Sequence, residues 1–258
     1  MKTFIRFISV FITCLLLLLA SIRLHPYYHL AKKQIIDKEM MNLPCSDTLI
    51  IAFIGDSWAA YHDDSTLDSI FLSRGKLTKV TSVGNVGAKS KEIYRRLYTT
   101  TMPLLKEHPA YCIVSAGIND AVAKLGSDYY VHHYMMIIHQ LMELDIKPVL
   151  LEMPDVNYHA IAGHEQWIKR MRHILSSLIT GSEMYGFDSY RTSLKQSIKQ
   201  AGWQSKVVYI SADTWNPDGY KDSRNLYMPD ETHLNAMGYE ILDSCIASVI
   251  LRDIGENK

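Results

Sequence analysis

Residues 48–57 read TLIIAFIGDS, an apolar run that ends in the tripeptide Gly-Asp-Ser. Unbroken apolar runs of this length are typical of a strand that is buried on both faces of a parallel sheet. A hydroxyl directly after such a strand projects at the edge of the sheet where active sites of open α/β folds lie. Gly-Asp-Ser is also an ordinary turn sequence, so the tripeptide alone leaves both interpretations open.

The rest of the chain alternates short apolar runs with longer segments of helical periodicity. The predicted strands are residues 48–54, 79–83, 111–115, 147–151 and 206–210. The predicted helices are residues 91–107, 128–144, 160–179, 189–201 and 235–252. This alternation predicts a three-layer α/β/α domain with a five-stranded parallel sheet and right-handed crossovers.

The composition of the chain argues against nucleic-acid binding and against a metal or redox site. The 258 residues include 27 basic and 27 acidic side chains, so no net charge draws the chain toward nucleic acid, and we expect no nucleic-acid partner. The four cysteines are scattered without the close spacing of a zinc site or a dithiol redox motif. We therefore expect neither a metal nor another cofactor.

An apolar segment occupies residues 7–22, with Lys2 and Arg6 before it and Arg23 after it. This layout is typical of a secretion signal or a signal anchor. Small residues suited to a cleavage site are missing before Ala20, which favours an uncleaved anchor in the membrane over a secreted protein. We predict a transmembrane or signal segment at 1–24, a linker at 25–47 and one domain at 48–258.

Two loops after predicted strands carry small or amide side chains. Residues 84–87 read GNVG, in which glycines allow close approach of the backbone to a ligand. Residues 117–120 read GIND and place the Asn119 amide at the same sheet edge as Ser57. Such an amide can bind a developing oxyanion. Alternatively, these residues build a tight turn and cap a helix.

Residues 230–233 read DETH and precede the last predicted helix. A carboxylate three residues before a histidine can orient the imidazole ring on one short turn, so Asp230 and His233 suit a base that removes the Ser57 proton. The alternative is a surface histidine beside an acidic residue near a helix start.

Together these four motifs, in this order, resemble those of the SGNH hydrolases, also called GDSL-type esterases and lipases. The resemblance covers residues 48–250 and departs from the family in the second motif, where Ser82 replaces the usual asparagine. It implies a flavodoxin-like strand order of 2-1-3-4-5. It also implies Ser57, Asp230 and His233 as catalytic residues, with Ser57, Gly87 and Asn119 binding the oxyanion.

The family resemblance implies a serine ester hydrolase that forms an acyl-enzyme. We expect it to act in the cell envelope on O-acyl groups, above all acetyl groups, of a glycan, with the domain held outside the cytoplasmic membrane. Trp58, Tyr61 and His62 are candidate substrate-binding residues because they follow the nucleophile directly. A lipid esterase, an O-acyltransferase and a catalytically silent envelope binding protein are the alternatives.

Overall fold

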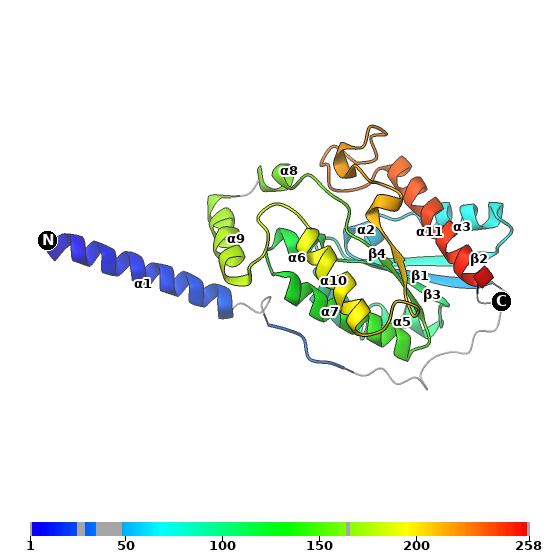
Figure 1. The fold of residues 1–258 in the computed structure, drawn as a ribbon, viewed down its shortest axis with the longest axis horizontal. Coiled ribbons are helices and arrows are strands. Elements are labelled where there is room, and N and C mark those ends of the chain that lie inside the picture. The colour runs from blue at the N-terminus through cyan, green and yellow to red at the C-terminus, as the bar shows by residue number, and fades with distance from the viewer. Residues whose placement is uncertain (1, 25–28, 35–47, 164–165, 257–258) are drawn as a thin grey trace.

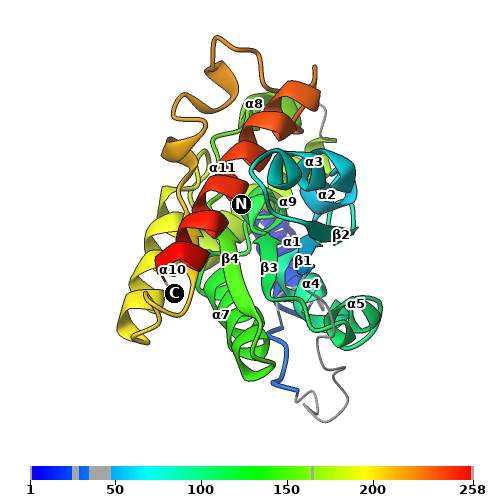
Figure 2. The ribbon, with the colours of Figure 1, turned by 90° about the vertical axis from the view of Figure 1, so that its right-hand side faces the viewer.

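The computed structural model describes residues 2–24, 29–34, 48–163 and 166–256 of the chain. Its sheet contains β1 (Leu49–Gly55), β2 (Thr78–Gly84), β3 (Tyr111–Ser115), β4 (Lys147–Leu151) and β5 (Val208–Ile210). The strand order is β2-β1-β3-β4-β5 and every pairing is parallel. Both the predicted parallel sheet and its predicted order are therefore confirmed (Figure 2).

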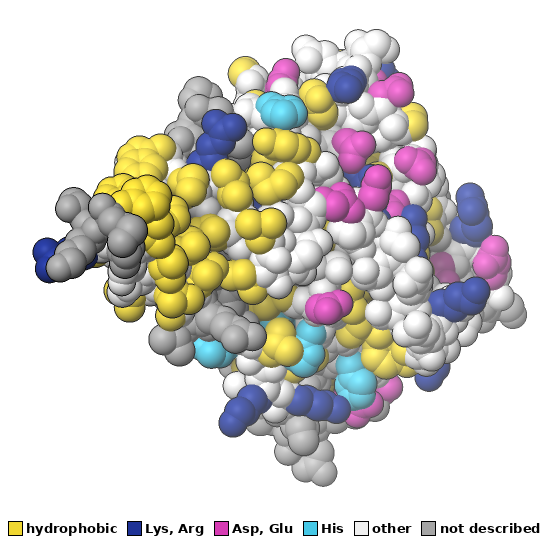
Figure 3. Space-filling model, turned by 60° about the vertical axis from the view of Figure 1, so that its left-hand side comes forward, with side chains coloured by type: hydrophobic (Ala, Val, Ile, Leu, Met, Phe, Trp, Pro, Cys, Tyr) yellow, Lys and Arg dark blue, Asp and Glu magenta, His cyan; other side chains and the backbone are white. Residues whose placement is uncertain are grey.

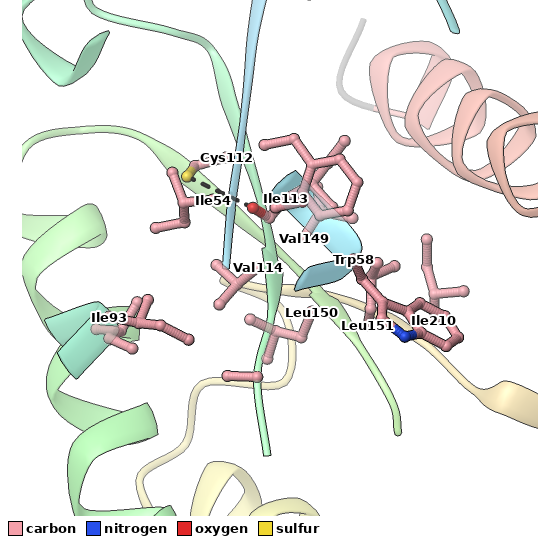
Figure 4. Packing of buried hydrophobic residues seen from close by; sticks show 14 of the residues in the cluster. Ile54, Trp58, Ile93, Cys112, Ile113, Val114, Val149, Leu150, Leu151 and Ile210 are labelled. Carbon is pink, nitrogen blue, oxygen red and sulfur yellow. Dashed lines mark hydrogen bonds between the residues drawn. The ribbon is translucent and has the colours of Figure 1, made fainter. Parts of the chain in front are cut away.

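Helices cover both faces of the sheet, which completes the predicted three layers (Figure 1). One layer contains α3 (Asp64–Ser73) and α11 (Ala236–Glu256), and the other contains α4 (Ser90–Arg96), α7 (Ser127–Glu143) and α10 (Asp188–Gln200). The central strands β1, β3 and β4 are apolar apart from Ser115 and Lys147 at strand ends, because both of their faces are covered. Their side chains, among them Ile113, Val149 and Leu150, are fully buried (Figure 4). Each such side chain stabilises the fold by roughly 1.5–3 kcal/mol.

Two of the predicted helices are each divided in the structure. The segment 91–107 forms α4 and a separate α5 (Met102–Lys106), with Pro103 in the first turn of α5. Proline has no N–H and clashes with the preceding turn, so it is tolerated where a helix begins and breaks one elsewhere. The segment 160–179 forms α8 (Tyr158–Gly163) and α9 (Trp167–Thr180).

Three helices of the structure were not predicted from the sequence. They are α2 (Ser57–Ala60), α3 and α6 (Ile118–Val122). Two of them are only about one turn long, which is too short to show a helical period. Asp63 caps α3 by accepting a hydrogen bond from the Ser65 N–H at 3.1 Å.

The N-terminal helix α1 (Lys2–Leu24) projects from the domain (Figure 1). In the described part of the chain, no helix is long and apolar enough to cross a membrane. The predicted linker 25–47 is described only at residues 29–34. These residues are not a free linker, because the Ala31 N–H donates to His133 Nε2 at 2.9 Å and the Gln34 N–H donates to the Tyr94 hydroxyl at 2.8 Å.

Candidate active site

Three side chains predicted to act together form one hydrogen-bonded series. Ser57 Oγ lies 2.9 Å from His233 Nε2, and His233 Nδ1 lies 2.6 Å from Asp230 Oδ2. Since the carboxylate can only accept, Nδ1 carries a proton and Nε2 is left to accept from the hydroxyl. Ser57 is 176 residues from His233 in sequence, so only the fold brings the two together.

The start of α2 sets the position of Ser57. Asp56 precedes the helix, and its carboxylate accepts a hydrogen bond from the Trp58 N–H at 3.1 Å. This cap satisfies one free N–H of the first turn, which keeps the turn tight behind the nucleophile. Burial raises the pKa of Asp56 to about 6, although the hydrogen bonds from Trp58 and Ser115 oppose the shift.

The turn that carries Asp230 and His233 is held by its own backbone. Asp230 Oδ1 accepts from the Thr232 N–H at 3.0 Å and from the His233 N–H at 2.9 Å. The Asn157 N–H donates to the Glu231 carbonyl at 3.0 Å, which ties the turn to the segment after β4. Burial favours the neutral acid, but the hydrogen bonds from His233 and Thr232 outweigh it and hold the pKa of Asp230 below its usual value.

Asn119 lies between the first two motifs. Its Nδ2 donates to the Ala88 carbonyl at 3.1 Å and is 3.5 Å from Asp56 Oδ2. The adjacent Asp120 is fully buried and accepts from the Ser90 hydroxyl at 2.6 Å and from the Ser90 N–H at 2.9 Å. Asp120 thus fastens the start of α4 to α6. From the sequence, Asp120 was expected only to build a turn or cap a helix, although its place beside Asn119 was a usable signal.

The two glycines of the second motif are needed for different structural reasons. A Cβ on Gly84 would lie 2.0 Å from the Ala60 nitrogen, so Gly84 allows β2 to approach α2 closely. A Cβ on Gly87 would meet nothing within 4 Å, but Gly87 has a φ of +77°, which other residues rarely adopt. Gly84 is thus required for packing, whereas Gly87 is required for the path of the loop beside Ala88.

Several solved structures share this architecture. A GDSL-like lipase from Bacteroides thetaiotaomicron aligns with a TM-score of 0.54 and 17% identity, over 83% of this chain and 94% of the lipase. A lipase/acylhydrolase from Enterococcus faecalis aligns with a TM-score of 0.57 and 17% identity, over 78% of this chain and 94% of the other. The chain has the SGNH hydrolase fold. An acetyl xylan esterase aligns with a TM-score of 0.54 and 15% identity, over 78% of this chain and 99% of the esterase.

The match is visible in three dimensions and not in sequence. No protein-family model and no curated protein matches the chain. Identities of 12–17% to the solved structures are too low to carry residue roles across. On the SGNH fold, the roles of individual residues must therefore be argued from the contacts of this chain.

The three candidate substrate-binding residues have separate environments on the SGNH fold. Tyr61 is 46% exposed, and its ring lies edge-on to His233 with a centroid distance of 5.1 Å. Trp58 is buried and packs against Trp215, while its Nε1 donates to the Thr232 carbonyl at 3.3 Å. Tyr61 is therefore open to a substrate, whereas Trp58 mainly supports the turn that carries His233.

His62 is not placed to bind a substrate, because its side chain is fully enclosed. Its Nε2 lies 3.0 Å from Asp243 Oδ1, and its Nδ1 lies 3.1 Å from Asp64 Oδ1 and 2.9 Å from Ser82 Oγ. Ser82 is the residue at which the second motif departs from the family pattern, and here it hydrogen-bonds both His62 and Asp64. The departure thus belongs to a network of hydrogen bonds and ion pairs around the enclosed His62, five residues after Ser57.

Proposed function

We propose that this protein is a serine ester hydrolase that works through an acyl-enzyme. The observation that carries the proposal is the series Ser57–His233–Asp230, joined at 2.9 Å and 2.6 Å. A nucleophile in hydrogen-bond contact with a base, which is in turn oriented by a carboxylate, suits attack on an ester carbonyl. The solved structures that share this fold include a GDSL-like lipase and a lipase/acylhydrolase, which supports ester hydrolysis.

In the first step, Ser57 Oγ attacks the ester carbonyl carbon while its proton passes to His233 Nε2. Asp230 stabilises the imidazolium and keeps the Nδ1–H in place. The tetrahedral intermediate then collapses, the bond to the alkoxy oxygen breaks, and the leaving alcohol takes the proton from Nε2. A water activated by the same imidazole attacks the acyl-enzyme and releases the carboxylic acid and free Ser57.

The negative charge on the carbonyl oxygen needs donors at the same sheet edge. The backbone N–H groups of Ser57 and Gly87 and the Asn119 amide are the proposed donors. Their support is local: Asn119 Nδ2 is bonded to the carbonyl of Ala88, the residue next to Gly87. Preorganised donors of this kind stabilise the charge without reorganising at the moment of reaction.

The favoured substrate is an O-acetylated glycan of the cell envelope. The side chain of Asp230 is 48% exposed, and Tyr61 is exposed beside His233, so this end of the series lies at the surface where a bulky chain can reach it, while Ser57 itself is buried. The solved neighbours include an acetyl xylan esterase. An aromatic ring at an open site can stack on a sugar while the acetyl group enters.

Limited space beside the nucleophile supports a small acyl group. The cavity lined by Asp56 and Trp58, the two chain neighbours of Ser57, has a volume of only about 10 Å³, and its other walls include Ser115, Glu152, Met153 and Trp215. This is close to the space that one water needs. A long acyl chain would require these side chains to move, which favours acetyl over fatty acyl groups.

The proposed location is the outer side of the cytoplasmic membrane, to which α1 attaches the domain. The helix exposes large apolar side chains, including Phe7, Phe11 and Leu17. Water is a poor environment for such a surface, and the apolar region of a bilayer is a favourable one. A secreted form is the alternative.

The proposal is tested by replacing the nucleophile. Ser57→Ala should abolish hydrolysis of 4-nitrophenyl acetate, by several orders of magnitude, because no other oxygen takes its place on His233. The variant should stay folded by circular dichroism, since the change removes one oxygen. A phosphonate ester should add covalently to the wild type at Ser57 and not to the variant. Unchanged turnover in a folded Ser57→Ala protein would exclude the mechanism.

A second assay addresses the acyl group and the acceptor. We expect the acetyl ester to be turned over faster than the octanoyl ester, because of the small cavity. Adding a sugar alcohol should leave the rate of acetate release unchanged if water is the acceptor. Transfer of the acetyl group to the sugar would identify an acyltransferase instead, and a folded wild type that turns over neither ester would indicate a binding protein.

A further inference from the structure

Helix α9 packs on the domain with its polar side. His173, Ser176 and Ser177 are the buried residues of this helix. The Ser176 hydroxyl donates to the Lys124 carbonyl at 2.7 Å, and the Ser177 hydroxyl donates to the Ser182 carbonyl at 2.7 Å. The contact between α9 and the domain is therefore built from hydroxyl groups and backbone carbonyls, where most surface helices place apolar side chains.

The opposite side of α9 is apolar and faces solvent. Trp167 is 75% exposed and Leu178 is 77% exposed, and three more large apolar residues of the helix are exposed with them: Ile168, Met171 and Ile179. At 100° per residue, these five positions fall within about one third of the helix circumference. Helix α9 is thus amphipathic in the reverse sense, with its apolar stripe directed away from the core.

Basic side chains border the apolar stripe. On the same helical projection, Arg170 lies at one edge of the stripe and Arg172 lies at the other. Arg170 is exposed and Arg172 is half-buried. Arginines in this position can keep their stems on an apolar surface while their guanidinium groups reach outward to anions. An apolar stripe with tryptophan, flanked by cations, is the pattern of helices that lie in a membrane interface.

The stripe continues onto a second apolar helix. The end of α1 nearest the domain approaches α9 (Figure 1), and hydrophobic side chains gather at this end of the molecule with basic side chains at their margin (Figure 3). Phe4, Phe7 and Leu16 of α1 are among the exposed apolar residues. Apolar side chains therefore extend from α9 to α1, and Arg170 and Arg172 border the stripe of α9.

We propose that α9 lies on the surface of an anionic phospholipid bilayer, with its apolar stripe at the boundary between head groups and acyl chains. The continuity with α1 and the positive border favour this occupant over another protein. Arg170 and Arg172 would meet lipid phosphates, and each cation near an anionic membrane surface favours binding. This inference does not depend on ester hydrolysis.

Trp167 provides a direct readout. The full chain is mixed with phosphatidylglycerol vesicles that carry bromine on their acyl chains, and tryptophan emission is recorded for the wild type and for Trp167→Phe. The difference between the two spectra isolates Trp167 from the other three tryptophans. We expect this difference emission to shift to shorter wavelength and to be strongly quenched by the brominated lipid. Trp203→Phe is the matched control, because Trp203 lies outside α9 and its loss should leave the quenching in place.

Two further measurements separate the possible occupants. Arg170→Gln together with Arg172→Gln should weaken the quenching on phosphatidylglycerol vesicles and have little effect on phosphatidylcholine vesicles. If the brominated lipid did not quench the emission of Trp167, the proposal would be overturned. So would a dimer of the full chain in mild detergent that Ile168→Glu with Leu178→Glu converts to a monomer, because a second copy would then cover the stripe.

Discussion

The carboxylate of Asp230 accepts hydrogen bonds from three groups of a single turn. They are the Thr232 N–H, the His233 N–H and His233 Nδ1. The two backbone donors hold the carboxylate in place independently of the imidazole ring, so the ring has one favoured orientation. That orientation points Nε2 at Ser57 Oγ. A local turn of four residues therefore sets which nitrogen of His233 faces Ser57.

Asp230→Asn should keep the turn but lose this control over the ring. The amide can offer a hydrogen to Nδ1, which favours the tautomer with the proton on Nε2, and that nitrogen then cannot accept from Ser57. We expect turnover of the acetyl ester to fall by on the order of 10⁴-fold with a nearly unchanged KM. The pH profile should change over the range in which an imidazole titrates. Steady-state kinetics from pH 5 to 9 would check this.

Asn119→Ala should act on a different atom, the carbonyl oxygen of the ester. Loss of one oxyanion donor lowers turnover by roughly 10²–10³-fold. The pH profile should keep its shape, because the proton path through His233 is untouched. If the variant raised only KM, Asn119 would be a ground-state binding residue or a structural one, since its amide also donates to the Ala88 carbonyl.

At the scale of elements, the enclosed network of His62 joins four parts of the fold. His62 follows α2, Asp64 begins α3, Ser82 lies in β2 and Asp243 lies in α11. Burial by itself lowers the pKa of His62, but its hydrogen bonds to Asp243 and Asp64 outweigh this and raise the pKa to about 9. The imidazolium thus holds α2, with its nucleophile, against two helices of one layer.

Folding should therefore depend on pH through His62. The pKa is higher in the folded chain than the ordinary value of 6.5, so the folded state binds more protons between these values. The stabilisation is fully present below about pH 6.5 and is lost as the pH rises through about 9. His62→Gln should lower the free energy of unfolding by roughly 3–5 kcal/mol at pH 6 and by less at pH 9.5. Urea unfolding of both proteins across this range would measure the difference.

A matched control for this experiment is Glu107→Gln. Glu107 pairs with Lys79 at 2.6 Å, but both side chains are about half exposed, so the pair contributes little. Its loss should change stability by a few tenths of a kcal/mol. If His62→Gln cost the same at pH 6 as at pH 9.5, the charge on His62 would have no part in stability.

The same network shows why sequence reasoning stopped short of some features. Strands β1, β3, β4 and β5 were predictable because each is a mainly apolar and mainly buried run between polar segments. Strand β2 is half polar, and only Val80 is buried in it. The two divided helices were less predictable, since their breaks before Met102 and before Trp167 lie inside continuous helical patterns. The enclosure of His62 depends on Asp243, 181 residues away, and no local pattern connects these two residues.

The candidate site followed a similar division. Ser57, Asn119, Asp230 and His233 each stand in a short motif after a strand or before a helix, so the motifs pointed to them individually. Their supports were not visible in the same way. Asp120 reaches Ser90, 30 residues earlier, and Asn157 reaches Glu231, 74 residues later. Such supports are chosen by tertiary packing, which a single sequence does not display.

At the scale of the whole molecule, we expect α1 and α9 to make separate contributions to membrane binding. The full chain should remain with membranes in high salt, because the apolar surface of α1 is not screened by ions. A chain beginning at His29 should bind anionic vesicles only at low salt, through α9 alone. Sedimentation with vesicles at 50 mM and 500 mM salt would compare the two chains. Release of the full chain by salt would contradict attachment through α1.

A chain beginning at Asp37 provides a matched comparison. It lacks the segment 29–34, whose Ala31 and Gln34 backbones are bonded to His133 and Tyr94. Losing these two bonds leaves His133 Nε2 buried without this donor, so the melting temperature should fall below that of the chain beginning at His29. Equal melting temperatures would show that the segment does not stabilise the domain.

Because residues 29–34 are bonded to the domain, they also limit how far the domain can lie from the end of α1. Helix α1 ends at Leu24 and the fastened segment begins at residue 29, so only residues 25–28 connect them. Even a fully extended connection of this length reaches no farther than about 20 Å. The domain therefore lies within this distance of the end of α1. With α1 attached to a membrane as proposed, the domain can reach only esters that lie on this surface or diffuse to it.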